Sequence, residues 1–294
     1  MKKIIYTSTF CLITLLGIVS CDILNKEPLD QISEKAVWND PALVEAYIND
    51  IYIGMGHGLH EVMLSSISDE THFTHGYGIP QIVESNVSPS DRGTFETRDD
   101  FNQWDWEDLY FRIRQINTFF EKIKDTNIKD QEVLNSFKGQ AYFLRAYFYH
   151  NLLRIYGGVP IITEPASLDD ELMVKRNSFA ETVDFIVSQA DSAAALLPAT
   201  HSGDDLGRAS GGAALALKSR VLLYAASDLF HQNPGGKEFT GYTGSTDQHQ
   251  MWRDAKDAAQ AVIDLDVYSL FRPNPAGPEE ASQNYYELFL TENN

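Results

Sequence analysis

The sequence predicts an all-α protein built from paired helices, and three observations lead to that fold class. Apolar residues recur with three- and four-residue spacing in several long segments. Capping residues and glycine or proline punctuation bound these segments. No series of short strand-like runs competes with them. With 294 residues, the chain is long enough for one large domain or two modest ones.

The first helix is expected directly after Asp40. This residue is a favourable N-cap, and Pro41 suits the first helical position because its missing N–H group is not needed there. Gly54 and Gly56 end the segment. One helical face is apolar and comprises Leu43, Val44, Tyr47, Ile48, Ile51, Tyr52 and Met55.

Periodicity is lost over residues 57–103, which are rich in glycine, serine, threonine, histidine and aromatic residues. An irregular segment of this length in a compact domain is usually functional or partly mis-assigned, and we expect a long loop with a binding role here. Helical spacing returns at Asp105 and continues to a polar turn over residues 125–130. The apolar positions of this second helix are Leu109, Ile113, Ile116, Phe120 and Ile123.

The next helix is apolar around nearly its whole circumference. One stripe comprises Phe137, Ala141, Leu144, Phe148, Leu152 and Ile155, and Tyr142, Phe143, Tyr147, Tyr149 and Leu153 fill most of the remainder. A helix of this composition belongs in the middle of a bundle. Gly157 and Gly158 end it, and Pro160 follows.

Three further helices are expected downstream. Ser178 and Glu181 form a capping box before a helix that Pro198 ends. Ser210 begins an alanine-rich helix that we expect to continue through Phe230. The final amphipathic helix carries Trp252, Ala255, Ala258, Ala259, Val262 and Leu265.

Alanine-rich crossings between consecutive helices favour tetratricopeptide-like helical pairs, because small side chains let two helix axes approach closely. No exact repeat period is present, so any repeats are degenerate. A plain irregular helical bundle is the open alternative.

The N-terminus has the pattern of a secretory leader. Lys2 and Lys3 precede an uncharged, mostly apolar run over residues 4–19, and the segment ends in Ile-Val-Ser-Cys at Cys21. This ending resembles the lipobox of bacterial lipoproteins, in which the cysteine is acylated and becomes the new N-terminus. We therefore predict a lipoprotein signal peptide over residues 1–20 and lipidation of Cys21. An ordinary cleaved signal and an uncleaved anchor are the alternatives.

Cleavage at that point would leave a strongly acidic protein without a free thiol. Cys11 would leave with the leader and Cys21 would carry lipid. The formal charge is −19, from 23 basic and 42 acidic residues, and loss of Lys2 and Lys3 makes it −21. Such a surface repels phosphate backbones, which argues against a nucleic-acid partner. We expect the membrane link to be the lipid.

Several stretches carry a family resemblance. "FKGQAYFLRAYFYHNLLRIYGGVPIIT" from Phe137 resembles the SusD/RagB family of Bacteroidetes outer-membrane lipoproteins. Three other stretches agree in order: "LYFRIRQINTFFEKI" from Leu109, "GRASGGAALALKSRVLLYAASDLF" from Gly207 and "WRDAKDAAQAVIDLDVYSLF" from Trp252. The resemblance covers the chain from Cys21 to about Phe271.

The resemblance implies a cell-surface nutrient-binding lipoprotein of the outer membrane. Family members sit as a lid on a SusC-type TonB-dependent transporter and usually capture oligosaccharides. With no catalytic motif in the sequence, we predict a non-catalytic protein. The resemblance also implies a tetratricopeptide-like helical domain over residues 21–230 with long irregular loops. Residues 231–294 would begin the C-terminal region, which relatives continue much further, so the chain is expected to be truncated relative to them.

The irregular segment supplies the candidate ligand-binding residues. Sugars stack flat C–H faces on aromatic rings and need polar partners for their hydroxyl groups, a mixture typical of ligand sites. The predicted contacts are the aromatic residues Phe73, Tyr77, Trp104 and Trp106 and the polar residues Asp99 and Asn102. Packing on the next helix is the alternative role of Trp104 and Trp106.

Catalytic and metal-binding signatures are weak. His57, His60, His72 and His75 form two His-x-x-His pairs, but Leu64 stands where a metalloprotease helix needs histidine. We therefore predict no catalytic residue, no metal and no cofactor. A lipid-anchored protein-interaction scaffold and a carboxylate-dependent glycoside hydrolase are the alternative functions.

Overall fold

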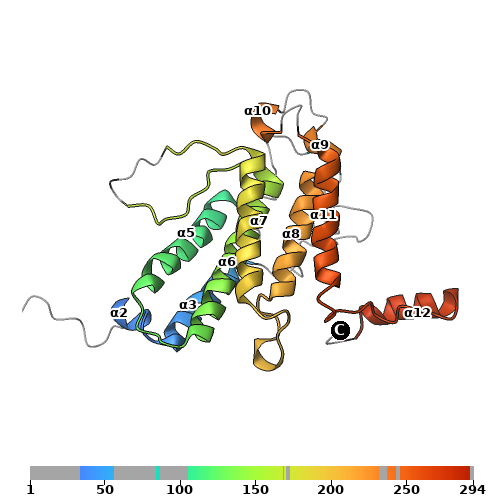
Figure 1. The fold of residues 1–294 in the computed structure, drawn as a ribbon, viewed down its shortest axis with the longest axis horizontal. Coiled ribbons are helices and arrows are strands. Elements are labelled where there is room, and N and C mark those ends of the chain that lie inside the picture. Colours follow the sequence, from blue (N-terminus) through green and yellow to red (C-terminus); the bar gives the residue numbers. More distant parts are fainter. Residues whose placement is uncertain are drawn as a thin grey trace, which may run out of the picture.

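The structure is a computed structural model, and it describes residues 34–55, 84–86, 105–167, 169, 173–231, 237–242 and 246–291. Every regular element in this part of the chain is helical, as the sequence predicts. Helices α3 (Pro41–Ile53), α5 (Trp106–Lys122) and α6 (Gln131–Tyr156) form one side of the molecule. Helices α7 (Phe179–Leu196), α8 (Gly211–Ala225) and α11 (Gln248–Ile263) continue the layer on the other side (Figure 1).

Helix α6 occupies the centre of the bundle. It packs against α7 on one side and against α5 and α3 on the other. Leu144, Phe148 and Tyr149 are fully buried, and burial of each large apolar side chain contributes about 2–3 kcal/mol. The predicted central position of this helix is thus confirmed. Ile155 is an exception, because it is 45% exposed near the end of the helix.

The termini of the helices follow the capping residues in the sequence. The Asp40 carboxylate accepts a hydrogen bond from the N–H group of Ala42 at the start of α3. The Ser178 hydroxyl accepts one from the N–H group of Glu181 in the predicted capping box of α7. After α6, Gly157 adopts a φ of 74°, which favours glycine.

The alanine-rich crossings are also confirmed, because α8 packs between α7 and α11. Ala214 and Ala225 of α8 and Ala255 and Ala258 of α11 are buried. The expected length of the α8 helix was wrong. It ends at Ala225, and a separate short helix, α9 (Asp228–His231), follows.

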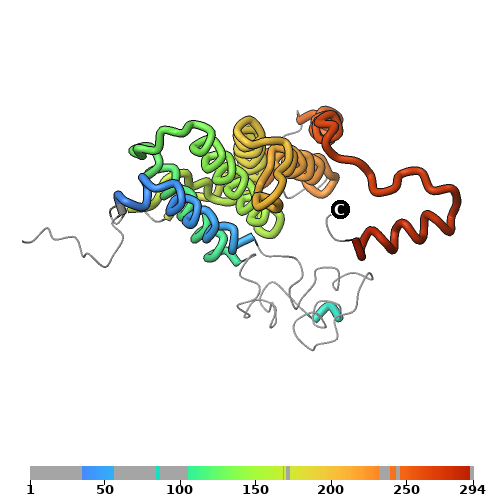
Figure 2. The backbone as a smooth tube through the Cα atoms, turned by 90° about the horizontal axis from the view of Figure 1, so that it is seen from below, coloured from blue at the N-terminus to red at the C-terminus, as the bar shows by residue number. Residues whose placement is uncertain are grey.

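The amphipathic helix predicted around Trp252 is α11, but it is not the last one. Helix α12 (Pro278–Leu288) follows and projects away from the bundle (Figures 1 and 2). This helix was not expected from the sequence. Of the apolar positions expected on α11, Ala255 and Ala258 are buried and Trp252 is 41% exposed. Leu265 was expected on α11 but lies beyond its end at Ile263.

The remaining labelled elements are short. They are α2 (Glu34–Val37), η5 (Ile123–Asp125), η6 (Gly203–Asp205) and α10 (Lys237–Thr240). Among the described residues, no helix is both long and apolar enough to cross a membrane.

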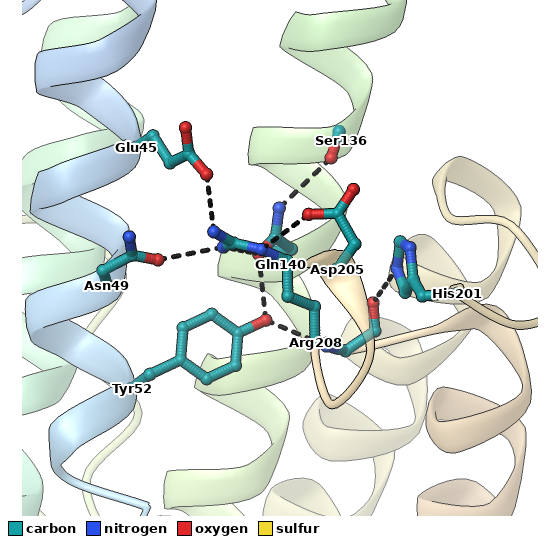
Figure 3. A network of polar contacts seen from close by, with 9 residues as sticks. Glu45, Asn49, Tyr52, Ser136, Gln140, His201, Asp205 and Arg208 are labelled. Carbon is teal, nitrogen blue, oxygen red and sulfur yellow. Dashed lines mark hydrogen bonds and ion pairs between the residues drawn. The ribbon is translucent and has the colours of Figure 1, made fainter. Parts of the chain in front are cut away.

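A polar network centred on Arg208 attaches the turn before α8 to α3 and α6 (Figure 3). The Arg208 guanidinium contacts Glu45 at 2.5 Å and Asp205 at 2.9 Å, and it donates to Asn49 at 2.9 Å and to Gln140 at 3.2 Å. Two carboxylates therefore neutralise this arginine. We call this set the Arg208 network.

Candidate functional site

Most of the predicted site lies outside the described residues. This holds for the lipidation site and for five of the predicted ligand contacts: Cys21, Phe73, Tyr77, Asp99, Asn102 and Trp104. The same is true of the four histidines of the His-x-x-His pairs. In the part of the chain that the structure describes, no group of three histidine, cysteine or acidic residues is placed to hold a metal ion.

Trp106 is the one predicted ligand contact that can be placed. It is the first residue of α5 and is half-buried. Its ring lies 4.9 Å from that of Tyr110 and 5.2 Å from that of Tyr156, and the Arg176 guanidinium carbon lies 5.9 Å from it. Trp106 thus packs at the junction of α5 and α6, as the packing alternative expects. Its contact with ligand stays a prediction.

A pocket of about 650 Å³ lies elsewhere on α5. It is bordered by the C-terminal half of α5, the middle of α6 and the extended segment 163–165. Its size is typical of small-molecule sites, which combine apolar walls with a few polar groups. The walls include Asn117, Phe120, Glu121, Lys124, Lys138, Tyr142, Arg145 and Glu164. We call it the α5–α6 pocket.

Arg145 is the most unusual residue of this pocket, because it is a cation that is only 6% exposed. Its guanidinium carbon lies 4.4 Å from the centroid of the Phe120 ring, a cation–π distance. Nε and Nη2 donate to Gln189 Oε1 at 2.9 and 2.7 Å, and Nη1 donates to Asn117 Oδ1 at 3.0 Å. Arg145 is thus held by neutral amides and aromatic rings.

Burial lowers the pKa of Arg145 to about 10, because removal from water penalises the charged form. Nearby tyrosines Tyr142 and Tyr149 act in the opposite direction. A guanidinium with this pKa is still protonated at neutral pH. The pocket therefore has a permanent positive charge in its wall.

The extended segment after α6 is held in place by side chains of α5 and α6. The Tyr149 hydroxyl accepts a hydrogen bond from the Ile162 N–H group at 2.7 Å. Asn117 Nδ2 donates to the Ile162 carbonyl oxygen at 2.9 Å. Both contacts position the residues that follow, so Glu164 lies at the edge of the pocket. Asn117 therefore links this segment to Arg145.

The structure does not bring Trp106 into the α5–α6 pocket. Phe120 follows it by fourteen residues on the same helix, a separation of roughly 20 Å at 1.5 Å per residue. The pocket was not expected from the sequence, because apolar periodicity assigned Phe120 and Tyr142 to the core. The available signal was Arg145, a charged residue inside a helix that is otherwise apolar around most of its circumference.

The paired helices and the polar–aromatic pocket together define an all-α protein with the features of a binding module. A model of the SusD-like family, described as starch-binding and associating with the outer membrane, matches residues 25–223. The chain belongs to this SusD-like family, as its sequence motifs predict.

Known relatives agree with this assignment. A SusD-like protein of Formosa agariphila is 26% identical over 267 residues, which cover 84% of this chain and 48% of the relative. A solved SusD-like protein from Bacteroides fragilis is 28% identical, with a TM-score of 0.59 over 84% of this chain and 42% of that protein. The chain thus spans about half the length of these relatives.

A second solved protein from Bacteroides fragilis, named a SusD-like carbohydrate binding protein, is 20% identical. It aligns with a TM-score of 0.57 over 78% of this chain and 41% of its own length. At this identity the likeness shows a common fold.

Proposed function

We propose that this protein is a non-catalytic, cell-surface glycan-binding lipoprotein that captures oligosaccharides and passes them to a SusC-type TonB-dependent transporter. The observation that carries the proposal is the family match over residues 25–223, whose description names both starch binding and the outer membrane. A solved relative of the same fold is named as carbohydrate binding.

The α5–α6 pocket supports glycan binding on physical grounds. Phe120 and Tyr142 lie with ring centroids 4.6 Å apart and both line the pocket. Aromatic rings of this kind pack against the C–H faces of sugars, whereas the Glu164 carboxylate can accept hydrogen bonds from hydroxyl groups. The predicted aromatic contacts Phe73, Tyr77, Trp104 and Trp106 are proposed as a further set of sugar contacts, and Trp106 lies outside this pocket.

Attachment to the outer membrane is proposed from the leader and from Cys21. One acyl chain gives only reversible membrane binding, so a stable anchor needs two or more chains on the processed N-terminus. The body has a net charge of −19 before processing and offers no cationic attraction to anionic lipids. The lipid would therefore be the means of attachment.

Three measurements on the full chain, expressed with its leader and extracted from outer membranes in detergent, test the proposal. Affinity electrophoresis against starch, laminarin, polygalacturonate and a sulfated polysaccharide should show retardation by at least one of them. Affinity capture should recover a large outer-membrane barrel, and Cys21→Ser should abolish labelling by radioactive palmitate.

Failure of all four polysaccharides to retard the protein would contradict the glycan-binding part. Retention of the label in Cys21→Ser would contradict the anchor. Capture of a barrel without any glycan retardation would favour the interaction-scaffold alternative.

A further inference from the structure

The charge of the α5–α6 pocket is opposite to that of the whole chain. The protein has a formal charge of −19, yet three cations line the pocket: Lys124, Lys138 and Arg145. Among the described residues, two carboxylates, Glu121 and Glu164, share the lining. In so acidic a protein, an excess of positive charge at one concave site requires a local reason.

The carboxylates do not neutralise these cations. Glu121 contacts Lys122, at 3.6 Å, rather than a cation of the pocket. Within the described ranges, neither Lys124 nor Lys138 forms an ion pair. With Glu121 and Glu164 counted against Lys124, Lys138 and Arg145, the residues of the lining carry a formal charge of +1. Charges in a concave site are less screened by water than charges on the open surface.

Arg145 also keeps unused donor capacity. A guanidinium has five N–H groups. Three donor contacts reach Gln189 and Asn117, and both acceptors are neutral amide oxygens. The other two N–H groups have no hydrogen-bond acceptor among the described residues. No carboxylate in this part of the chain forms an ion pair with the guanidinium. A buried cation is normally paired with an anion, because isolation of its charge from water is costly.

We propose that the α5–α6 pocket binds the anionic group of an acidic saccharide, either a uronate carboxylate or a sulfate ester. Arg145 supplies a fixed donor at the base, and Lys138 and Lys124 add mobile positive charge at the rim. The rings of Phe120 and Tyr142 border the same space and pack against the sugar. This inference rests on the proposed function and specifies its substrate class.

The chemistry of the two anions favours this arrangement. Carboxylates and sulfates both present several acceptor oxygens, and charge-assisted hydrogen bonds to them are shorter and stronger than those between neutral groups. Arginine suits such planar or multi-oxygen groups because its donors are held in a rigid fork. The neutral amides Gln189 and Asn117 orient that fork without neutralising it.

Isothermal titration of the full chain in detergent tests the proposal with three tetrasaccharides of equal length. One is an oligogalacturonide, one is a sulfated galactan fragment and one is a neutral laminari-oligosaccharide. At least one acidic probe should bind about tenfold more tightly than the neutral probe at 50 mM salt. Its affinity should fall at 500 mM salt, whereas that of the neutral probe should not.

Lys138→Gln is the informative variant because Lys138 is half-buried in the pocket wall and lies outside the core. It should weaken the acidic probe about tenfold and leave any neutral binding unchanged, and Lys138→Arg should restore affinity. Lys129→Gln is the matched control, since it removes the same charge from an exposed position outside the pocket.

The outcomes separate this inference from the proposed function. Binding of the neutral probe with equal or higher affinity, insensitive to Lys138→Gln, overturns the acidic preference and leaves glycan binding intact. Acidic binding that Lys129→Gln weakens as much as Lys138→Gln also overturns the site, because only overall charge then matters. No binding of any of the three tetrasaccharides overturns the acidic preference, and electrophoresis against the four polysaccharides then decides whether glycan binding itself stands. The uronate and sulfate probes together identify which anion is preferred.

Discussion

Two regions of this molecule hold an arginine within the helical bundle, and they do so in opposite ways. In the Arg208 network, the guanidinium side chain is 19% exposed and contacts the carboxylates of Glu45 and Asp205. In the α5–α6 pocket, Arg145 is 6% exposed and contacts only amides and rings among the described residues. The more deeply buried arginine is therefore the one without a counter-ion.

This difference shows what each arginine does for the fold. The Arg208 carboxylates are half-exposed, so water solvates them and the network joins α3, α6 and the turn before α8 at little desolvation cost. A carboxylate beside Arg145 would itself have to leave water, which costs several kcal/mol per ion. Neutral amides avoid that cost and leave the charge of Arg145 available to a ligand.

The largest expected effect comes from Arg145→Ala, which should lower the free energy of unfolding by about 4 kcal/mol. The truncation leaves a cavity beside Phe120 and removes the donors from Gln189 and Asn117. Chemical denaturation followed by far-ultraviolet circular dichroism measures the loss. A loss below about 1 kcal/mol would show that Arg145 contributes little to stability. Arg145 and Arg208 would then no longer differ in their effect on the fold.

His150 is a second buried base on α6, and it should make the free energy of unfolding fall by about 3 kcal/mol as the pH is lowered. Burial lowers its pKa to about 4, and the neighbouring cations Arg154 and Arg220 add to the shift. The unfolded chain protonates this histidine near pH 6.5, whereas the folded protein keeps it neutral. Its contribution to stability is therefore complete above about pH 6.5 and is lost as the pH falls toward 4.

Unfolding free energies measured between pH 8 and pH 4 test this dependence. His150→Leu should remove it, and the exposed control His249→Ala should keep the wild-type slope. An unchanged slope in His150→Leu would mean that other groups dominate the acid loss. The comparison would then rest on the arginines alone. Together, the His150 and Arg145 variants test whether α6 keeps its buried histidine neutral and its buried arginine charged.

Arg208→Ala should lower the free energy of unfolding by about 1–2 kcal/mol, less than Arg145→Ala, although it breaks more contacts. Its released carboxylates Glu45 and Asp205 are 46% and 59% exposed and can be hydrated. Denaturation under the same conditions as for Arg145→Ala gives the direct comparison. A greater loss for Arg208→Ala than for Arg145→Ala would reverse the ranking that exposure predicts.

Glu45→Gln should have the smallest effect and lower the free energy of unfolding by about 0.5 kcal/mol. This residue is one of two carboxylates in the network and lies near the surface. The effect should shrink further at 1 M salt, where surface charges are screened. Denaturation at low and high salt measures both values. A salt-independent loss would indicate a structural change rather than a lost ion pair.

Much of the helical scaffold follows directly from the sequence because its causes are local. Asp40 and Pro41 start α3, and Ser178 and Glu181 start α7, through contacts within one helical turn. The apolar circumference of α6 placed that helix in the centre of the bundle. These predictions needed only residues that are neighbours along the chain.

The candidate site was predicted much less completely. Of the six proposed ligand contacts, only Trp106 lies within the described residues, and there it packs against Tyr110 and Tyr156. The α5–α6 pocket was missed because apolar periodicity does not distinguish Phe120 in a pocket wall from an aromatic residue in the core. The break after Ala225 and helix α12 were missed as well.

By itself, the sequence determined the all-α class, the positions of the caps, the family and the negative charge of the chain. Only the tertiary structure decided which polar groups meet. Arg208 reaches Glu45 across 163 positions, and the pocket combines residues of α5, α6 and segment 163–165. The physical reason is that capping and periodicity act within a few residues. Burial and charge pairing depend instead on which helices pack side by side.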